Sequence, residues 1–312
     1  MPNALFQGEN HEKKVKFMKY GTLLKILYFF LPAAAAVRTV QLICTVNPAD
    51  GFVYRKYESL SLTLGIITAA VCAAFIISGL SLKTAGKPAP EKYGNSVTIS
   101  LFVMSFFSIA GGIVALFFSA PVTTQVTISA AADILMGIFF FAGAKGCLEK
   151  RTINGATGIA AVFWSAAKLV IYYSNFDGII MNTENILNLM ALCTSMMFWL
   201  YFAHINVSYR TVSSLKYVWA FGSMAAFFCT LCTVPRITVT IIGRNDVLNT
   251  ASSIEPVNIA TVLFILTILS AFKPQIESRC LNRLAGSIQT DESSEGENDI
   301  NDFDFSENGD IQ

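Results

Sequence analysis

Residues 60–82 read LSLTLGIITAAVCAAFIISGLSL and contain no charged side chain. A transmembrane helix needs roughly 20 consecutive apolar residues, so this stretch is long enough to cross a bilayer. Its apolar residues are continuous rather than alternating, and it is about twice the length of a transmembrane strand. The stretch therefore predicts a membrane-spanning helix and argues against a β-barrel.

Seven further stretches are also long and predominantly apolar, and proline or polar residues separate them. The chain is 54% hydrophobic and 14% charged, whereas a soluble domain carries about 25% charged residues. We therefore expect an all-α fold, a polytopic transmembrane helical bundle of about eight helices with a disordered acidic C-terminal tail. The expected spans are 24–46, 60–82, 97–119, 127–146, 156–174, 185–205, 214–234 and 256–272, with breaks at Pro121, Pro235 and Pro256.

The basic residues predict the orientation of these spans. Sixteen Lys and Arg precede or open the first span or follow the second, fourth, sixth and eighth, and the opposite side has only Arg55, Lys56, Arg236 and Arg244. Lys and Arg concentrate in cytoplasmic loops, so both termini are expected in the cytoplasm of a cell whose plasma membrane holds the protein. A signal peptide cleaved near Ala36 is the alternative for the first span, but Lys25 interrupts its apolar core.

Charge also divides the chain into four segments. Nine of the 21 acidic residues lie after Thr290, where no Lys or Arg is found. Such a segment buries too little apolar surface to offset its ordering entropy. We expect a basic cytoplasmic segment at 1–23, the membrane domain at 24–273, a juxtamembrane segment at 274–289 and a disordered tail at 290–312. In that tail, Ile300, Phe303 and Phe305 are the candidate contacts for a protein partner.

Three charged residues lie deep within the expected spans, away from their ends and at similar depth on the predicted outer side. These are Arg38, Asp133 and Lys168. The fourth and fifth spans are joined by a short loop and are expected to be neighbours, so Asp133 and Lys168 are expected to form an ion pair. An isolated charge at the centre of a span costs roughly 2.5–3.5 kcal/mol, which is why such residues face a bundle interior.

These charges permit two interpretations. In the first they are structural, with the Asp133–Lys168 pair joining two helices and Arg38 reaching the headgroups through its long side chain. In the second they belong to a polar pocket open to the outside. Its further members share helical faces with these charges or lie on the sixth span; they are Gln41, Tyr172 and Asn188.

Sequence motifs for catalysis or cofactor binding are missing from the chain. It has no phosphate-binding glycine loop, no serine nucleophile elbow and no His-Glu-x-x-His, and only two histidines. Cys229 and Cys232 form a Cys-x-x-Cys, expected to pack within a helix. No enzyme activity, cofactor, metal or nucleic-acid partner is therefore expected, and the lipid bilayer is the one partner that the composition itself predicts.

Two segments raise further comparisons. Arg38-Thr39-Val40-Gln41-Leu42 followed by Asn47-Pro48-Ala49-Asp50-Gly51-Phe52 resembles a loose group of uncharacterised multipass membrane proteins of Firmicutes bacteria. The resemblance covers about 15 residues and implies a bacterial cytoplasmic membrane without implying an activity. An Asp-Gly turn also follows the fifth span, at Asp177-Gly178, so helices one to four and five to eight are either a parallel repeat or share ordinary turn chemistry.

Two functions of different class follow from these patterns. The first is a small-solute transporter or permease-like protein, supported by the polar residues and by the parallel repeat that is one of the two interpretations above. The second is a membrane sensor, assembly factor or scaffold that acts through its cytoplasmic tail. The solute or other ligand is not specified by the sequence.

Overall fold

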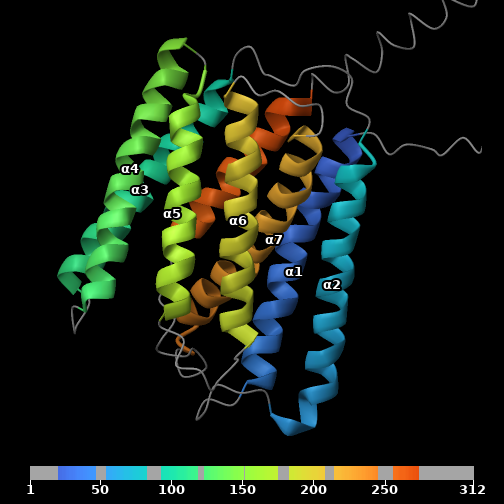
Figure 1. Cartoon of the computed structure of the whole chain (residues 1–312). Coiled ribbons are helices and arrows are strands. Elements are labelled where there is room, and N and C mark those ends of the chain that lie inside the picture. Colours follow the sequence, from blue (N-terminus) through green and yellow to red (C-terminus); the bar gives the residue numbers. More distant parts are fainter. Residues whose placement is uncertain are drawn as a thin grey trace, which may run out of the picture.

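The computed structural model describes residues 20–46, 54–82, 93–118, 123–150, 152–174, 183–207, 214–244 and 256–273. These residues form eight helices long and apolar enough to cross a membrane, arranged as one bundle (Figure 1). The chain is therefore a multipass integral membrane protein. The helices are α1 (Tyr20–Thr45), α2 (Glu58–Leu80), α3 (Asn95–Phe118), α4 (Thr124–Lys150), α5 (Gly155–Ser174), α6 (Thr183–Asn206), α7 (Ser214–Ile241) and the eighth helix (Pro256–Lys273), with a short 3-10 turn (Arg55–Tyr57) before α2.

The predicted fold class is confirmed, because eight spans lie where eight were expected. Seven of them agree with the prediction to within a few residues. The seventh was predicted to end at residue 234, which is wrong: α7 continues through Pro235 to Ile241. A proline removes one helical hydrogen bond, and neighbouring helices make this tolerable inside a membrane. The expected segments 274–289 and 290–312 lie outside the described residues, and so do residues 1–19 of the segment expected at 1–23, whose last four residues belong to α1.

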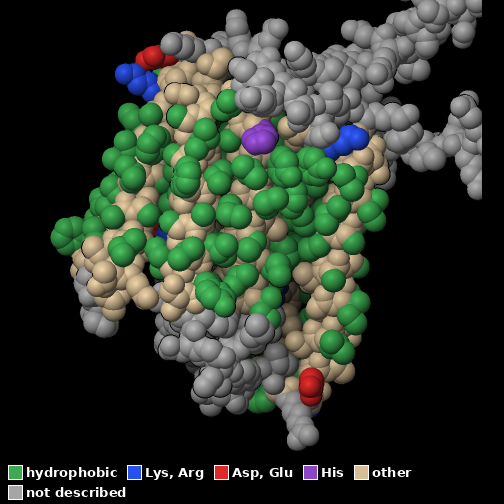
Figure 2. Space-filling view, in the orientation of Figure 1, with side chains coloured by type: hydrophobic (Ala, Val, Ile, Leu, Met, Phe, Trp, Pro, Cys, Tyr) green, Lys and Arg blue, Asp and Glu red, His purple; other side chains and the backbone are tan. Residues whose placement is uncertain are grey.

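Apolar side chains cover the outside of the bundle between its two ends. Figure 2 shows hydrophobic side chains over most of the visible helical surface, with charged side chains mainly towards the top and bottom. Large exposed residues of this kind include Phe29, Leu62, Phe117 and Phe163. Water would penalise such a surface, whereas lipid tails solvate it, so the exterior matches a bilayer.

Helix α7 lies at the centre of the bundle and is the most buried of the eight spans. It packs against α1, α2 and α6, and Gly222 brings it close to Ile265 of the eighth helix. The eighth helix adds an aromatic cluster, in which Phe264 stacks on Trp199 with ring centroids 5.0 Å apart. Tyr20 at the start of α1 donates a hydrogen bond to the Leu269 carbonyl at 2.7 Å.

Helix α2 lies at the edge and packs mainly on α7, with one aromatic contact between its Phe75 and Phe30 of α1. Gly79 is its one buried residue. A Cβ at Gly79 would stand 2.8 Å from both the Ala220 Cβ and the Lys216 carbonyl oxygen of α7. The neighbouring Ser78 hydroxyl accepts a hydrogen bond of 3.0 Å from the Trp219 indole. Small residues thus set how closely α2 approaches α7.

Gly79→Ala is expected to lower the thermal stability of the purified protein, while Gly65→Ala is not. The added methyl at Gly79 meets α7 backbone, and overpacking of this kind costs typically 1–3 kcal/mol. At Gly65, on the same helix, an added Cβ meets nothing within 4 Å, and alanine is the better helix former. The measurement is the midpoint of unfolding in detergent. Equal midpoints for the two variants would contradict close α2–α7 packing.

The two halves of the bundle pack differently. Helix α5 packs along α6, whereas the corresponding α1 and α2 both pack mainly on α7. Helices one to four and five to eight therefore do not share a common arrangement of neighbours among the labelled helices. The turn chemistry noted in the sequence needs no duplication, because Asp-Gly is a common turn signal.

Candidate functional site

Most of the polar side chains of interest lie towards one end of the bundle. We call it the lower end, as Figure 1 draws it: the end at which α1, α3, α5 and α7 terminate and the other four helices begin. Three groups of side chains occur there. They connect α4 with α5, α5 with α6, and α1 with α6 and α7.

The first group is the predicted ion pair between Asp133 of α4 and Lys168 of α5. The Lys168 Nζ lies 2.7 Å from the Asp133 Oδ2. Both side chains are close to buried, 12% and 11% exposed. Lys168 also donates to the Ser129 hydroxyl at 2.9 Å, and the Trp164 indole donates to the Asp133 Oδ1 at 2.8 Å. The predicted pair is confirmed.

This geometry follows from the spacing of the four residues. Ser129 and Asp133 are four residues apart on α4, and Trp164 and Lys168 are four apart on α5, so each pair shares one helical face. Both oxygens of the Asp133 carboxylate accept a hydrogen bond. The carboxylate is thereby compensated within the protein, as a buried ion pair requires. The structural interpretation of this pair is favoured.

The second group connects α5 with α6 through a tyrosine. Tyr172, one turn beyond Lys168, donates a hydrogen bond to the Asn185 side-chain oxygen at 2.9 Å. The Asn188 amide donates to the Tyr172 hydroxyl at 3.4 Å. Two predicted pocket residues, Tyr172 and Asn188, are thus brought together. Tyr172 continues the polar face of α5 towards the lower end, and Asn188 meets it from α6.

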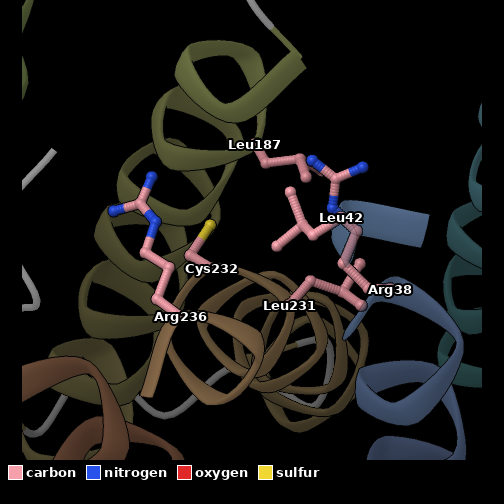
Figure 3. A pocket seen from close by; sticks show the side chains of 6 residues that line it. All are labelled: Arg38, Leu42, Leu187, Leu231, Cys232 and Arg236. Atoms are coloured by element: carbon pink, nitrogen blue, oxygen red, sulfur yellow. The ribbon is translucent and has the colours of Figure 1, made fainter. Parts of the chain in front are cut away.

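The third group surrounds a hollow between α1, α6 and α7 (Figure 3). It is lined by Arg38, Leu42, Leu187, Leu231, Cys232 and Arg236. The space between these side chains holds about one water molecule. Arg38 donates to the Gln41 side-chain oxygen at 2.6 Å, and both residues are 7% exposed. Predicted residue Arg38 therefore lines a hollow that Asp133 and Lys168 do not line, and Gln41 accepts a hydrogen bond from it.

Arg236 is the residue that the sequence interpretation missed. It was assigned to an outer loop, which is wrong: it lies inside α7 and is 5% exposed. Proline usually disrupts a helix, so Pro235 predicts a span that ends at residue 234, whereas α7 continues through it. The continuing apolar residues Ile237, Val239 and Ile241 are the signal in the sequence that extends the helix past it.

Pro235 also changes the backbone beside the hollow. Proline has no N–H, so it cannot donate to the carbonyl of the residue four positions earlier. That residue is Leu231, which lines the hollow. A backbone acceptor is thus released from the helical ladder next to two arginines. The helix nevertheless continues through this position to Ile241, as membrane helices do where neighbouring groups compensate a proline.

The cysteines and possible metal ligands add no second centre among the described residues. Cys229 lies 3.6 Å from the Ser195 hydroxyl, a packing contact between α6 and α7. Cys232 lines the hollow, so the two cysteines of the Cys-x-x-Cys have different neighbours. Within the described ranges, no three His, Cys, Asp or Glu residues are grouped to hold a metal ion.

Comparisons with protein-family models, with curated proteins and with solved structures found no match for the chain. The class of protein is therefore inferred from its fold and its site alone. They define a multipass integral membrane protein with a hollow between α1, α6 and α7 that two buried arginines line.

Proposed function

We propose that the protein is a small-solute transporter without enzymatic activity, and that its solute enters at the hollow between α1, α6 and α7. The observation that carries the proposal is that Arg38 and Arg236 both line that hollow. Ionisable residues inside a membrane are costly, and they most often mark a substrate or ion pathway. Here two of them come from different helices and line one site.

The surrounding helices support the same function. Helix α7 contributes Arg236, and Pro235 beside it removes one backbone hydrogen bond from a helix that otherwise continues to Ile241. The polar face formed by Tyr172, Asn185 and Asn188 lies on α5 and α6, and α6 also contributes Leu187 to the hollow. Polar side chains near the lower end thus come from four helices, α1, α5, α6 and α7. The alternative proposal is a sensor or scaffold that acts through its tail. The small size of the hollow favours this alternative, because a transporter needs room for its solute.

The lower end is proposed to face the outside of a plasma membrane, with both termini in the cytoplasm. The distribution of Lys and Arg motivates this orientation. Reporter fusions after Lys92 and after Ser287 are expected to give a cytoplasmic signal. An active alkaline phosphatase fusion at either position would contradict the orientation.

A flux measurement tests transport itself. Proteoliposomes are loaded with unlabelled amino acids and short organic acids, and exchange with the labelled mixture outside is followed. The wild-type protein is expected to accumulate label above protein-free vesicles. Leu187→Trp, which fills the hollow, is expected to reduce exchange to the protein-free level.

Ile186→Trp provides the matched control, because Ile186 is the preceding residue on α6 and is 40% exposed rather than part of the lining. Its exchange is expected to equal that of the wild type. Equal exchange by both tryptophan variants would contradict a solute path through this hollow.

A further inference from the structure

We infer that the hollow binds a small oxyanion, a carboxylate or phosphate group held by Arg38 and Arg236. The inference deepens the proposed function, on which it rests for the entry of the ligand, and it names the chemical class of the solute. It is carried by where the two guanidinium groups lie, by their donor capacity and by the character of the other lining residues.

The two guanidinium groups reach the hollow from different helices. In Figure 3 the Arg236 side chain extends from α7 and the Arg38 side chain from α1, one on each side of Leu42 and Cys232, and both extend towards α6. They are 5% and 7% exposed. None of the six lining residues is acidic. An anion entering the hollow therefore meets two cations in surroundings where charge-assisted hydrogen bonds are strong.

A guanidinium group has several donors, so it can bind a ligand and a protein partner at the same time. Both arginines have interactions within the chain, and one of them joins Arg38 to Gln41. A guanidinium carries five N–H donors in a planar fork that matches carboxylate and phosphate oxygens. The fork selects oxyanions over spherical anions, because two parallel hydrogen bonds need two acceptor oxygens.

The remaining lining indicates a ligand with a compact apolar part. Leu42, Leu187, Leu231 and the Cys232 thiol offer no charge and little hydrogen bonding. The hollow holds about one water molecule, so an oxyanion enters by displacing that water and moving the leucine side chains apart. A carboxylate or phosphate bearing a short carbon chain fits these surfaces better than a fully polar anion.

The test is the thermal unfolding of the purified full-length protein in neutral detergent. Sodium acetate, succinate and phosphate are compared with sodium chloride at equal ionic strength, and phosphatidylglycerol is added in a separate arm. Oxyanions are expected to raise the unfolding midpoint and chloride is not. Arg38→Gln and Arg236→Gln are each expected to weaken the apparent affinity about 10- to 100-fold, as hydrogen bonds to charged groups imply.

Lys56→Gln is the matched control, because Lys56 is an exposed cation near the same end of the bundle and does not line the hollow. Its oxyanion response is expected to equal that of the wild type. No rise with any oxyanion, or a rise that survives both arginine variants, would overturn the inference. An arginine-dependent rise with phosphatidylglycerol alone would support the oxyanion site with a lipid headgroup as its occupant, and it would contradict an anionic transported solute.

A second measurement keeps the inference testable if the arginine variants do not fold. In the wild-type protein, the stabilising oxyanion is expected to slow alkylation of Cys232 and leave that of the exposed Cys44 unchanged. Unchanged alkylation of Cys232 would overturn the site. Exchange of neutral or cationic solutes without oxyanion binding would contradict the oxyanion site and support the transporter. Oxyanion binding without exchange of any solute would support the oxyanion site and contradict the transporter.

Discussion

Asp133→Ala alone is expected to destabilise the protein more than Asp133→Ala combined with Lys168→Ala. Removing one partner of a buried ion pair costs about 3–5 kcal/mol, because the surviving charge is left uncompensated. Lys168 would keep the Ser129 hydroxyl, 2.9 Å away, and lose the carboxylate at 2.7 Å. The double variant removes both charges from the α4–α5 interface. The measurement is the free energy of unfolding in mixed micelles.

The control for this comparison is Glu149→Ala on the same helix. Glu149 forms an i,i+4 contact with Lys145 at 3.8 Å, and the two side chains are 55% and 66% exposed. An exposed pair contributes at most about 1 kcal/mol, so this variant is expected to differ little from the wild type. A double variant less stable than Asp133→Ala would show that the pair is not the interaction that matters at this interface.

Phe264→Ala is the other substitution with a large expected effect. Its ring is fully buried and lies in contact with Phe198, Trp199 and Phe202 of α6. Replacing a buried phenylalanine by alanine typically costs about 3–5 kcal/mol, through lost contacts and the cavity left behind. The eighth helix would thereby lose its main aromatic contact with α6, and the unfolding midpoint in detergent is expected to fall accordingly.

The same substitution at Phe29 serves as its control. Phe29 is 82% exposed on α1, where lipid or detergent takes the place of the ring. Phe29→Ala is therefore expected to leave the midpoint nearly unchanged. Equal losses at Phe29 and Phe264 would contradict the packing of the eighth helix on α6 through Phe264.

The number and approximate bounds of the spans could be predicted because hydropathy alone determines them. The order of helices within the bundle could not. Helix α2 has the highest hydropathy of the eight spans and is the least buried, whereas the less hydrophobic α7 is the most buried. Lipid tails are as apolar as leucine, so hydrophobicity does not distinguish a central helix from a lipid-facing one.

The ion pair could be predicted from the cost of burying a charge, whereas the hollow could not, because a proline precedes one of its two arginines. Asp133 and Lys168 stand out within apolar runs on consecutive spans, and their pairing follows from the cost of a lone charge. The sequence places Arg38 and Gln41 correctly inside a span. It assigns Arg236, the other arginine that lines the hollow, to a loop. Arg236 follows Pro235, and a rule that ends helices at proline hides it.

Access to Cys232 from both sides of the membrane is the most direct test of transport through the hollow. The protein is prepared with Cys232 as its sole cysteine, and an impermeant thiol reagent is applied from outside or inside sealed vesicles of known orientation. A transporter exposes its site alternately to the two sides, so labelling is expected from both, and the stabilising oxyanion is expected to slow each. Labelling from the outside only, or from neither side, would contradict transport through this hollow.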